Sequence, residues 1–322
     1  MVLFAPAVII SLPTAGSATV AHHLRPRPPR AGLTLVPVGW TSTPATLWSG
    51  GIERHYLVIR PPKTTAPLPT VVVLPGRSLD PTEIERMSEL IPVVGKAIFV
   101  YPAGVDRSWN AGACCGLAHS LGINDVAFLD ALIRHVVATE PGASARRVYL
   151  IGFSNGGRMA YRMACQSPHL LTAFAAVEAV PVLGCRKLDP TPTVIVAQRG
   201  DPLLTVAAGG RPKTVGGYVE PTVDATVAHW LALDGCGAAA SVTTLGSARV
   251  ATYDRCRGAG RLEYVLYAGG HHDWPLGDAR TPSAGELIWA FFRHTIPHAG
   301  PPLLAQHPGR PHPRRGPGAL VG

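Results

Sequence analysis

Short apolar runs alternate along this chain with longer segments of helical periodicity, and this alternation limits the possible folds more than any other feature. The runs predicted as strands are 55–60, 70–74, 97–101, 147–151, 192–197 and 261–267. The segments predicted as helices are 83–91, 124–139, 156–165, 219–233 and 284–293. Strands that alternate with helices in this way are typical of an α/β fold, with a mostly parallel central sheet and helices on both faces.

The two ends of the chain differ from its middle. Residues 1–30 begin with an apolar stretch rich in small residues that turns polar after Ala21, so we expect a signal peptide or a disordered N-terminal segment. Residues 298–322 are too dense in proline and glycine for a regular element, and we expect a flexible tail rich in proline and arginine. A single folded domain over residues 31–297 is then the simplest organisation.

The net charge of +9 belongs mostly to the ends. Three arginines lie in residues 1–30 and three in residues 299–322, with no acidic residue in either stretch. Removing these six charges leaves +3 for the remainder, so no nucleic-acid partner is expected for the folded part. Binding of nucleic acid by the basic ends remains an alternative, and deletion of residues 299–322 would test it. No apolar run is long enough for a stable membrane span.

Six cysteines, an even number, favour disulfide bonds in an exported chain. They are Cys114, Cys115, Cys165, Cys185, Cys236 and Cys256. Sequence alone allows 15 connectivities. We favour the two local pairs, 165 with 185 and 236 with 256, which leaves 114 and 115 as a vicinal pair. Six reduced thiols are the alternative, and the absence of a C-x-x-C pair argues against a structural zinc site.

The sequence Gly152-Phe153-Ser154-Asn155-Gly156 lies directly between a predicted strand and a predicted helix. In this context the G-x-S-x-G pattern predicts a nucleophile elbow, in which a serine stands on a tight turn clear of the sheet. The start of the following helix directs backbone N–H groups at an oxyanion that develops beside the serine. An ordinary strand-to-helix turn is the alternative.

A serine nucleophile needs a base and an acid, which follow it in the order Ser, Asp or Glu, His. Asp201 follows the predicted strand 192–197 and is the preferred acid, with a turn-capping role as its alternative. Three other acids lie in the right part of the chain but in less suitable positions: Asp189, Asp224 and Asp234. His271 and His272 lie in a glycine-rich loop after the last predicted strand, and spacing alone does not choose between them. A metal site formed by these histidines with Asp273 is a minor alternative.

Several blocks of the chain resemble secreted α/β hydrolases of the polyhydroxybutyrate-depolymerase-like and feruloyl-esterase-like type. The blocks are 109–112, 114–116, 122–126 with 128–129, 152–165, 201–202 with 209–210, Trp230, Cys236, Cys256 and 270–275. The resemblance covers roughly residues 50–295 and is most specific around Ser154. In that family the base lies two residues before a Trp-Pro pair, which points to His272, while His271 stands where glycine is usual.

The chain departs from the family pattern at two places. After the second predicted strand it has Leu74-Pro75-Gly76-Arg77 where the family usually has His-Gly. The oxyanion donor there is a backbone N–H, which Arg77 can still supply beside that of Asn155, although Pro75 alters the loop. Ahead of its acid the family usually has a second His-Gly, whereas this chain has the stretch Ala197-Gln198-Arg199-Gly200 before Asp201. Both departures bear on activity and leave the three triad positions intact.

The resemblance implies an α/β-hydrolase catalytic domain over residues 31–297 that is secreted and cleaves carboxylic esters through Ser154, Asp201 and His272, without a metal or an organic cofactor. Esters of polyhydroxyalkanoate oligomers, feruloyl or acetyl esters of polysaccharides, and small esters are the expected substrates. Trp109 and Trp274 are candidates for substrate contact, with core packing as the alternative. A non-catalytic binding protein with the same fold is the second functional hypothesis, and the oligomeric state is left open.

Overall fold

The computed structural model describes residues 36–185, 189–207, 210–237 and 241–295. The expected leader within residues 1–30 and the expected tail, residues 298–322, lie outside the described residues. Among the described helices, none combines the length and the apolar composition that crossing a bilayer requires.

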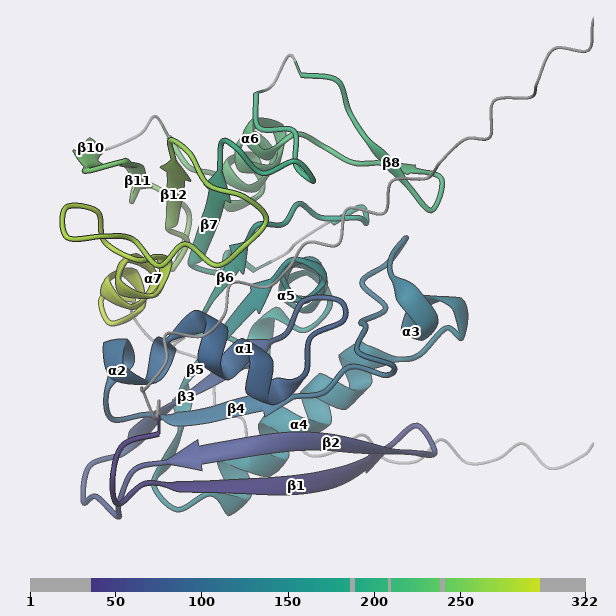
Figure 1. The fold of residues 1–322 in the computed structure, drawn as a ribbon, viewed down its shortest axis with the longest axis vertical. Coiled ribbons are helices and arrows are strands. Elements are labelled where there is room, and N and C mark those ends of the chain that lie inside the picture. The colour runs from purple at the N-terminus through teal and green to yellow at the C-terminus, as the bar shows by residue number, and fades with distance from the viewer. Residues whose placement is uncertain (1–35, 186–188, 208–209, 238–240, 296–322) are drawn as a thin grey trace, which may run out of the picture. The chain divides into compact units, whose positions relative to one another are not determined.

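The fold alternates strands and helices along the chain (Figure 1). The strands are β1 Thr41–Ser49, β2 Ile52–Arg60, β3 Leu68–Leu74, β4 Ile98–Pro102, β5 Ala143–Phe153, β6 Ala173–Val177, β7 Thr193–Gln198, β8 Thr214–Val215, β9 Tyr218–Val219, β10 Ser241–Leu245, β11 Ala248–Tyr253 and β12 Leu262–Tyr267. The helices are α1 Pro81–Ser88, α2 Leu90–Val94, α3 Gly116–Ser120, α4 Asp125–Thr139, α5 Asn155–Gln166, α6 Val223–Asp234 and α7 Ala284–Phe292, with a 3₁₀ turn at Pro168–Leu170.

Ten of these strands form one sheet in the order β1-β2-β4-β3-β5-β6-β7-β12-β11-β10. The six central strands, β4 to β12 in this order, run parallel, and an antiparallel pair of strands extends the sheet at each end. The expected α/β class with a mostly parallel central sheet is confirmed. Ligand sites in such sheets form at the carboxyl ends of the parallel strands, where the connecting loops meet.

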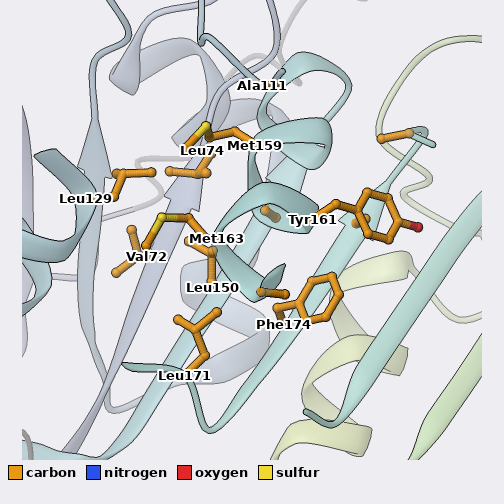
Figure 2. Close-up of a cluster of buried hydrophobic side chains, with 14 of the residues drawn as sticks. Val72, Leu74, Ala111, Leu129, Leu150, Met159, Tyr161, Met163, Leu171 and Phe174 are labelled. Atoms are coloured by element: carbon orange, nitrogen blue, oxygen red, sulfur yellow. The ribbon is translucent and has the colours of Figure 1, made fainter. Parts of the chain in front are cut away.

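Both faces of the sheet are buried because helices cover each of them. Val72 and Leu74 of β3 pack on the face that carries α4 and α5, whereas Val71 and Val73 pack on the face that carries α2 and α7. This two-sided burial explains why the central strands are continuous apolar runs. Figure 2 shows the first of these cores, in which Met159 and Met163 of α5 lie over β3 and β5.

The structure differs from the sequence-based elements in two respects. The helix predicted over 83–91 is two helices, because Glu89 between α1 and α2 adopts a left-handed conformation with φ 49°. The hydrophobic runs also gave no prediction for β1, β6, β8, β9, β10 and β11 or for the short helix α3. β1 and β10 are largely exposed edge strands with few apolar residues, and β6 is a short run rich in alanine, so none of them carries a strong strand signal.

The six cysteines form three disulfides, which pair Cys165 with Cys185, Cys236 with Cys256 and Cys114 with Cys115. These are the pairs that the sequence favoured among the possible connectivities. The first links the end of α5 to the segment after β6, and the second links the end of α6 to the segment after β11.

Candidate active site

Ser154 lies on the turn between β5 and α5, and three glycines make this turn possible. A Cβ atom added to Gly152 would lie 2.1 Å from the carbonyl oxygen of Gly156, and one added to Gly156 would lie 2.3 Å from that of Leu74. A Cβ atom on Gly157 would lie 2.6 Å from the Cβ of Ala179. The glycines therefore allow the helix to approach its own strand and the strands on either side.

The backbone of Ser154 is itself strained, with φ 52° and ψ −119° in a residue that is not glycine. Such a conformation persists only where the surrounding structure imposes it, and it is found most often at functional sites. Ser154 precedes α5 without capping it through its side chain. Its hydroxyl is therefore available to another partner.

That partner is His272. Ser154 Oγ lies 2.7 Å from Nε2 of His272, and Nδ1 of the same ring lies 2.7 Å from Oδ2 of Asp201. An ionised carboxylate can only accept a hydrogen bond, so Nδ1 carries the proton and Nε2 is left to accept from the serine hydroxyl. The structure thus brings together the three residues that the sequence pattern and the resemblance singled out, from loops after β5, β7 and β12.

The carboxyl group of Asp201 is buried, and its surroundings favour the ionised form. Asp201 is 4% exposed, and its second oxygen, Oδ1, accepts a hydrogen bond of 2.6 Å from the backbone N–H of Leu203. Burial alone would raise the pKa of Asp201, but hydrogen bonds from His272 and Glu178 and the charge of His272 hold this pKa below its usual value. The group is therefore suited to orient an imidazole and to stabilise its charged form.

The three rival acids lie elsewhere. Asp189 is exposed and precedes β7, at the opposite end of that strand from Asp201. Asp224 and Asp234 belong to α6, where Asp224 accepts a hydrogen bond of 3.2 Å from the hydroxyl of Tyr264.

The loop that carries His272 is held by a residue that sequence analysis did not select. Nε2 of Gln198, the last residue of β7, donates to the carbonyl oxygens of His271 and Asp273 at 2.6 and 3.0 Å, and to Oδ1 of Asp273 at 2.8 Å. A Cβ atom on Gly270 would lie 1.7 Å from Oε1 of Gln198. His271 itself is exposed, so only its main chain takes part in this arrangement.

The two predicted oxyanion donors lie at suitable places in the chain. Asn155 is the first residue of α5, where backbone N–H groups have no partner within the helix. Its side chain exchanges hydrogen bonds of 2.8 and 3.0 Å with the backbone of Trp109, which holds the turn against the segment before α3. The segment that carries Arg77 passes close to Ser154, since a Cβ atom on Gly76 would lie 3.2 Å from the Cβ of Ser154. The Arg77 side chain is exposed.

Both candidate substrate-contact tryptophans are buried. Trp109 has no exposed surface, stacks with Phe128 at 6.5 Å between ring centroids and donates its indole N–H to the carbonyl oxygen of Pro75 at 3.0 Å. Trp274 is 3% exposed and packs against Phe153. These contacts are the ones expected if both tryptophans pack in the core. A role of either ring in substrate contact stays a prediction.

A second acid, Glu178, lies beside this group and was also missed. Ligand atoms of Glu178, Asp201 and His272 lie within 4.8 Å of one another, and among the described residues this is the group whose spacing could suit a metal ion. The 2.7 Å contact between His272 and Asp201 already engages both of them in a hydrogen bond. An available signal was the position of Glu178 directly after the apolar run 173–177.

Comparisons with known proteins agree with this architecture, although no family model matches the chain. Over 224 residues the chain is 28% identical to a probable feruloyl esterase C of Aspergillus terreus, a match that covers 68% of this chain and 72% of that protein. It is 29% identical over 205 residues to feruloyl esterase C of Emericella nidulans, covering 62% and 65% respectively. The matched part thus spans about two thirds of the length of these relatives.

Among solved structures, an acetyl xylan esterase from Aspergillus awamori superposes with a TM-score of 0.56 at 12% sequence identity, covering 78% of this chain and 99% of that one. At this identity the likeness concerns the fold alone. The polyhydroxybutyrate-depolymerase part of the resemblance stays a prediction. In sequence this chain is therefore similar to feruloyl esterases, and its fold is that of α/β-hydrolase esterases.

Proposed function

We propose that this protein is a carboxylic ester hydrolase that uses Ser154 as its nucleophile, His272 as its general base and acid, and Asp201 as the residue that orients His272. The observation that carries the proposal is the continuous path from Ser154 Oγ through the two ring nitrogens of His272 to Asp201 Oδ2, with 2.7 Å at both links. Heavy-atom distances of this size are those that proton transfer between a nucleophile and its base requires.

The reaction proceeds in two halves. Ser154 Oγ attacks the ester carbonyl carbon while His272 Nε2 takes the hydroxyl proton, and the carbonyl oxygen becomes an oxyanion that accepts from the N–H groups of Asn155 and Arg77. His272 then returns the proton to the departing alcohol, which leaves an acyl group on the serine. A water molecule, deprotonated by His272, attacks this acyl group and releases the acid and the free serine.

Feruloyl esters are the substrate class that we favour, because the relatives matched in sequence are feruloyl esterases. Acetylated polysaccharides, hydroxybutyrate oligomers and small soluble esters are the other candidates. A panel of methyl ferulate, acetylated xylan and hydroxybutyrate oligomers separates these classes by their kcat/KM values. Preference for the oligomers would transfer the substrate assignment to the polyhydroxybutyrate-depolymerase side of the resemblance.

The test of the catalytic proposal compares the wild-type protein with Ser154→Ala on p-nitrophenyl acetate and butyrate. Loss of a nucleophilic serine is expected to lower kcat by about 10³-fold or more. Equal rates for the two proteins would contradict the proposal and favour the alternative, a binding protein with a hydrolase fold.

We also propose that the protein works in an oxidising, extracellular environment. The support is the presence of three disulfides, which persist in secreted proteins and are rare in reducing compartments. Alkylation of free thiols before and after reduction, read by mass spectrometry on protein recovered from its native source, tests this.

A further inference from the structure

Glu178 occupies a position beside the site that the proposed mechanism does not explain. It directly follows β6, and its backbone N–H donates to the carbonyl oxygen of Val196 in the neighbouring strand β7 at 3.0 Å. Asp201 follows that same strand by three residues. The two acids therefore emerge from the carboxyl ends of adjacent parallel strands.

The side chain of Glu178 is enclosed. The residue is 1% exposed, and neither carboxyl oxygen has a hydrogen-bond partner among the described residues that meets full hydrogen-bond geometry. Its backbone is left-handed, with φ 49°, which is unusual for a residue other than glycine. An acid held in a strained conformation inside the protein carries a cost that a purely structural position does not require.

The neighbours of this carboxyl group determine its ionisation. Charged or titratable groups facing it are Asp201 after β7, His272 and Asp273 in the loop after β12, and Tyr267 at the end of β12. Two carboxylates so close in a buried site cannot both ionise without strong repulsion. The backbone N–H of Leu203 and His272 stabilise ionised Asp201. Burial and Asp201 oppose the ionisation of Glu178 more strongly than the backbone N–H of Gln198 favours it.

We propose that Glu178 is a protonated positioning residue, whose carboxyl proton is directed at Asp201 so that the acid of the triad is a pair of carboxyl groups with a single negative charge. This inference rests on the proposed function in so far as Asp201 acts on His272. Burial, and then the hydrogen bond and the charge of Asp201, raise the pKa of Glu178 well above its usual range, which agrees with the assignment. Glu178 touches no reacting atom and acts through Asp201.

Two variants distinguish the effect of the hydrogen-bond donor of Glu178 from the effect of the shape of its side chain. Glu178→Gln keeps the length and an N–H donor but cannot ionise, whereas Glu178→Met keeps the length and removes the donor. We expect Glu178→Gln to retain kcat within about threefold, and Glu178→Met to lower kcat about tenfold at similar KM, as expected when a hydrogen bond to a charged group is lost.

The pH profile provides a readout that a structural role would not move. Without its donor, Asp201 interacts more strongly with protonated His272, so the acid limb of kcat/KM should move to higher pH in Glu178→Met and stay in place in Glu178→Gln. The matched control is Glu263→Gln, which alters another buried acid, at the amino end of β12 and away from the triad. Equal kcat values and equal pH profiles for the two Glu178 variants would overturn the proposal.

Infrared difference spectroscopy detects the carboxyl proton of Glu178 directly and does not depend on turnover. It therefore tests this inference separately from the proposed function, even if Ser154→Ala and the wild-type protein show equal rates. At pH 7 the spectrum of wild type minus Glu178→Gln should contain the carbonyl stretch of a protonated carboxylic acid. Carboxylate bands in its place would show that Glu178 is ionised and would refute the inference. Because Glu178→Gln closely matches the wild-type shape, this measurement also remains decisive if Glu178→Met does not fold.

Discussion

Nε2 of Gln198 donates hydrogen bonds to two atoms of Asp273, the backbone carbonyl oxygen at 3.0 Å and the side-chain oxygen Oδ1 at 2.8 Å. The same nitrogen reaches the carbonyl oxygen of His271, so the residues on both sides of His272 are tied to the end of β7. Asp201 follows that strand three residues later. One strand thus holds the loop of His272 through its last side chain, and the loop that follows the strand carries Asp201.

Replacement of Gln198 by leucine removes this connection while the volume stays similar. We expect kcat to fall about 10-fold to 100-fold, because His272 would no longer be held within reach of both Ser154 and Asp201. The free energy of unfolding should fall by about 1–3 kcal/mol, since buried carbonyl oxygens lose their donor. Steady-state kinetics and urea denaturation measure the two effects. Gln166→Leu, at an exposed position at the end of α5, is the matched control, and an unchanged kcat in Gln198→Leu would contradict this role.

The two adjacent histidines should differ sharply. His272→Ala removes the group between Ser154 and Asp201, and we expect turnover of p-nitrophenyl butyrate to fall about 10³-fold or more. His271→Ala leaves intact the carbonyl group that Gln198 contacts and removes only an exposed ring, so activity should stay within about threefold of wild type. The reverse pattern would transfer the role of base to His271.

Gly156 should tolerate no side chain. Alanine at this position places its Cβ atom 2.3 Å from the carbonyl oxygen of Leu74 and 2.6 Å from that of Pro75, both of them backbone atoms that cannot easily move. We expect Gly156→Ala to lower the free energy of unfolding by about 2 kcal/mol or more. Gly184→Ala is the control, because nothing lies within 4 Å of the added atom, and its effect should stay below about 0.5 kcal/mol. Equal thermal stabilities for the two variants would show that the turn adapts to a side chain.

Glu263 should make the stability of the protein depend on pH. Burial raises its pKa from 4.5 to about 7, against the opposing effects of Arg261 and a hydrogen bond from Thr252. A raised pKa means that the folded state binds the proton more tightly than the unfolded state, so stability falls as the pH rises from about 4.5 to about 7 and levels off above. The loss from this one group is about 3 kcal/mol over that window.

Glu263→Gln removes the titration and should abolish this part of the slope. Denaturation curves for both proteins at pH 5, 6, 7 and 8 measure this slope. The free energy of unfolding of the variant, relative to that of the wild type, should increase as the pH rises. Two parallel stability profiles would mean that Glu263 does not carry the proton.

The sequence by itself determined the features that depend on neighbouring residues. The strand-turn-helix around Ser154, the apolar central strands and the helix Asp125–Thr139 could be predicted because their signals are glycines at fixed positions and local periodicity. The preference for local cysteine pairs agrees with the structure for a related reason, since partners only 20 residues apart meet easily.

Only the tertiary structure decided which distant candidates lie together. His272 and Ser154 are 118 positions apart, and they meet because β5, β6, β7 and β12 are neighbours in the sheet with their carboxyl ends at one edge. The same order places Glu178 beside Asp201 and lets Gln198 reach the loop after β12. No periodicity in the sequence encodes these contacts, because they depend on the lateral order of strands, which is set by the packing of the whole sheet between its two layers of helices.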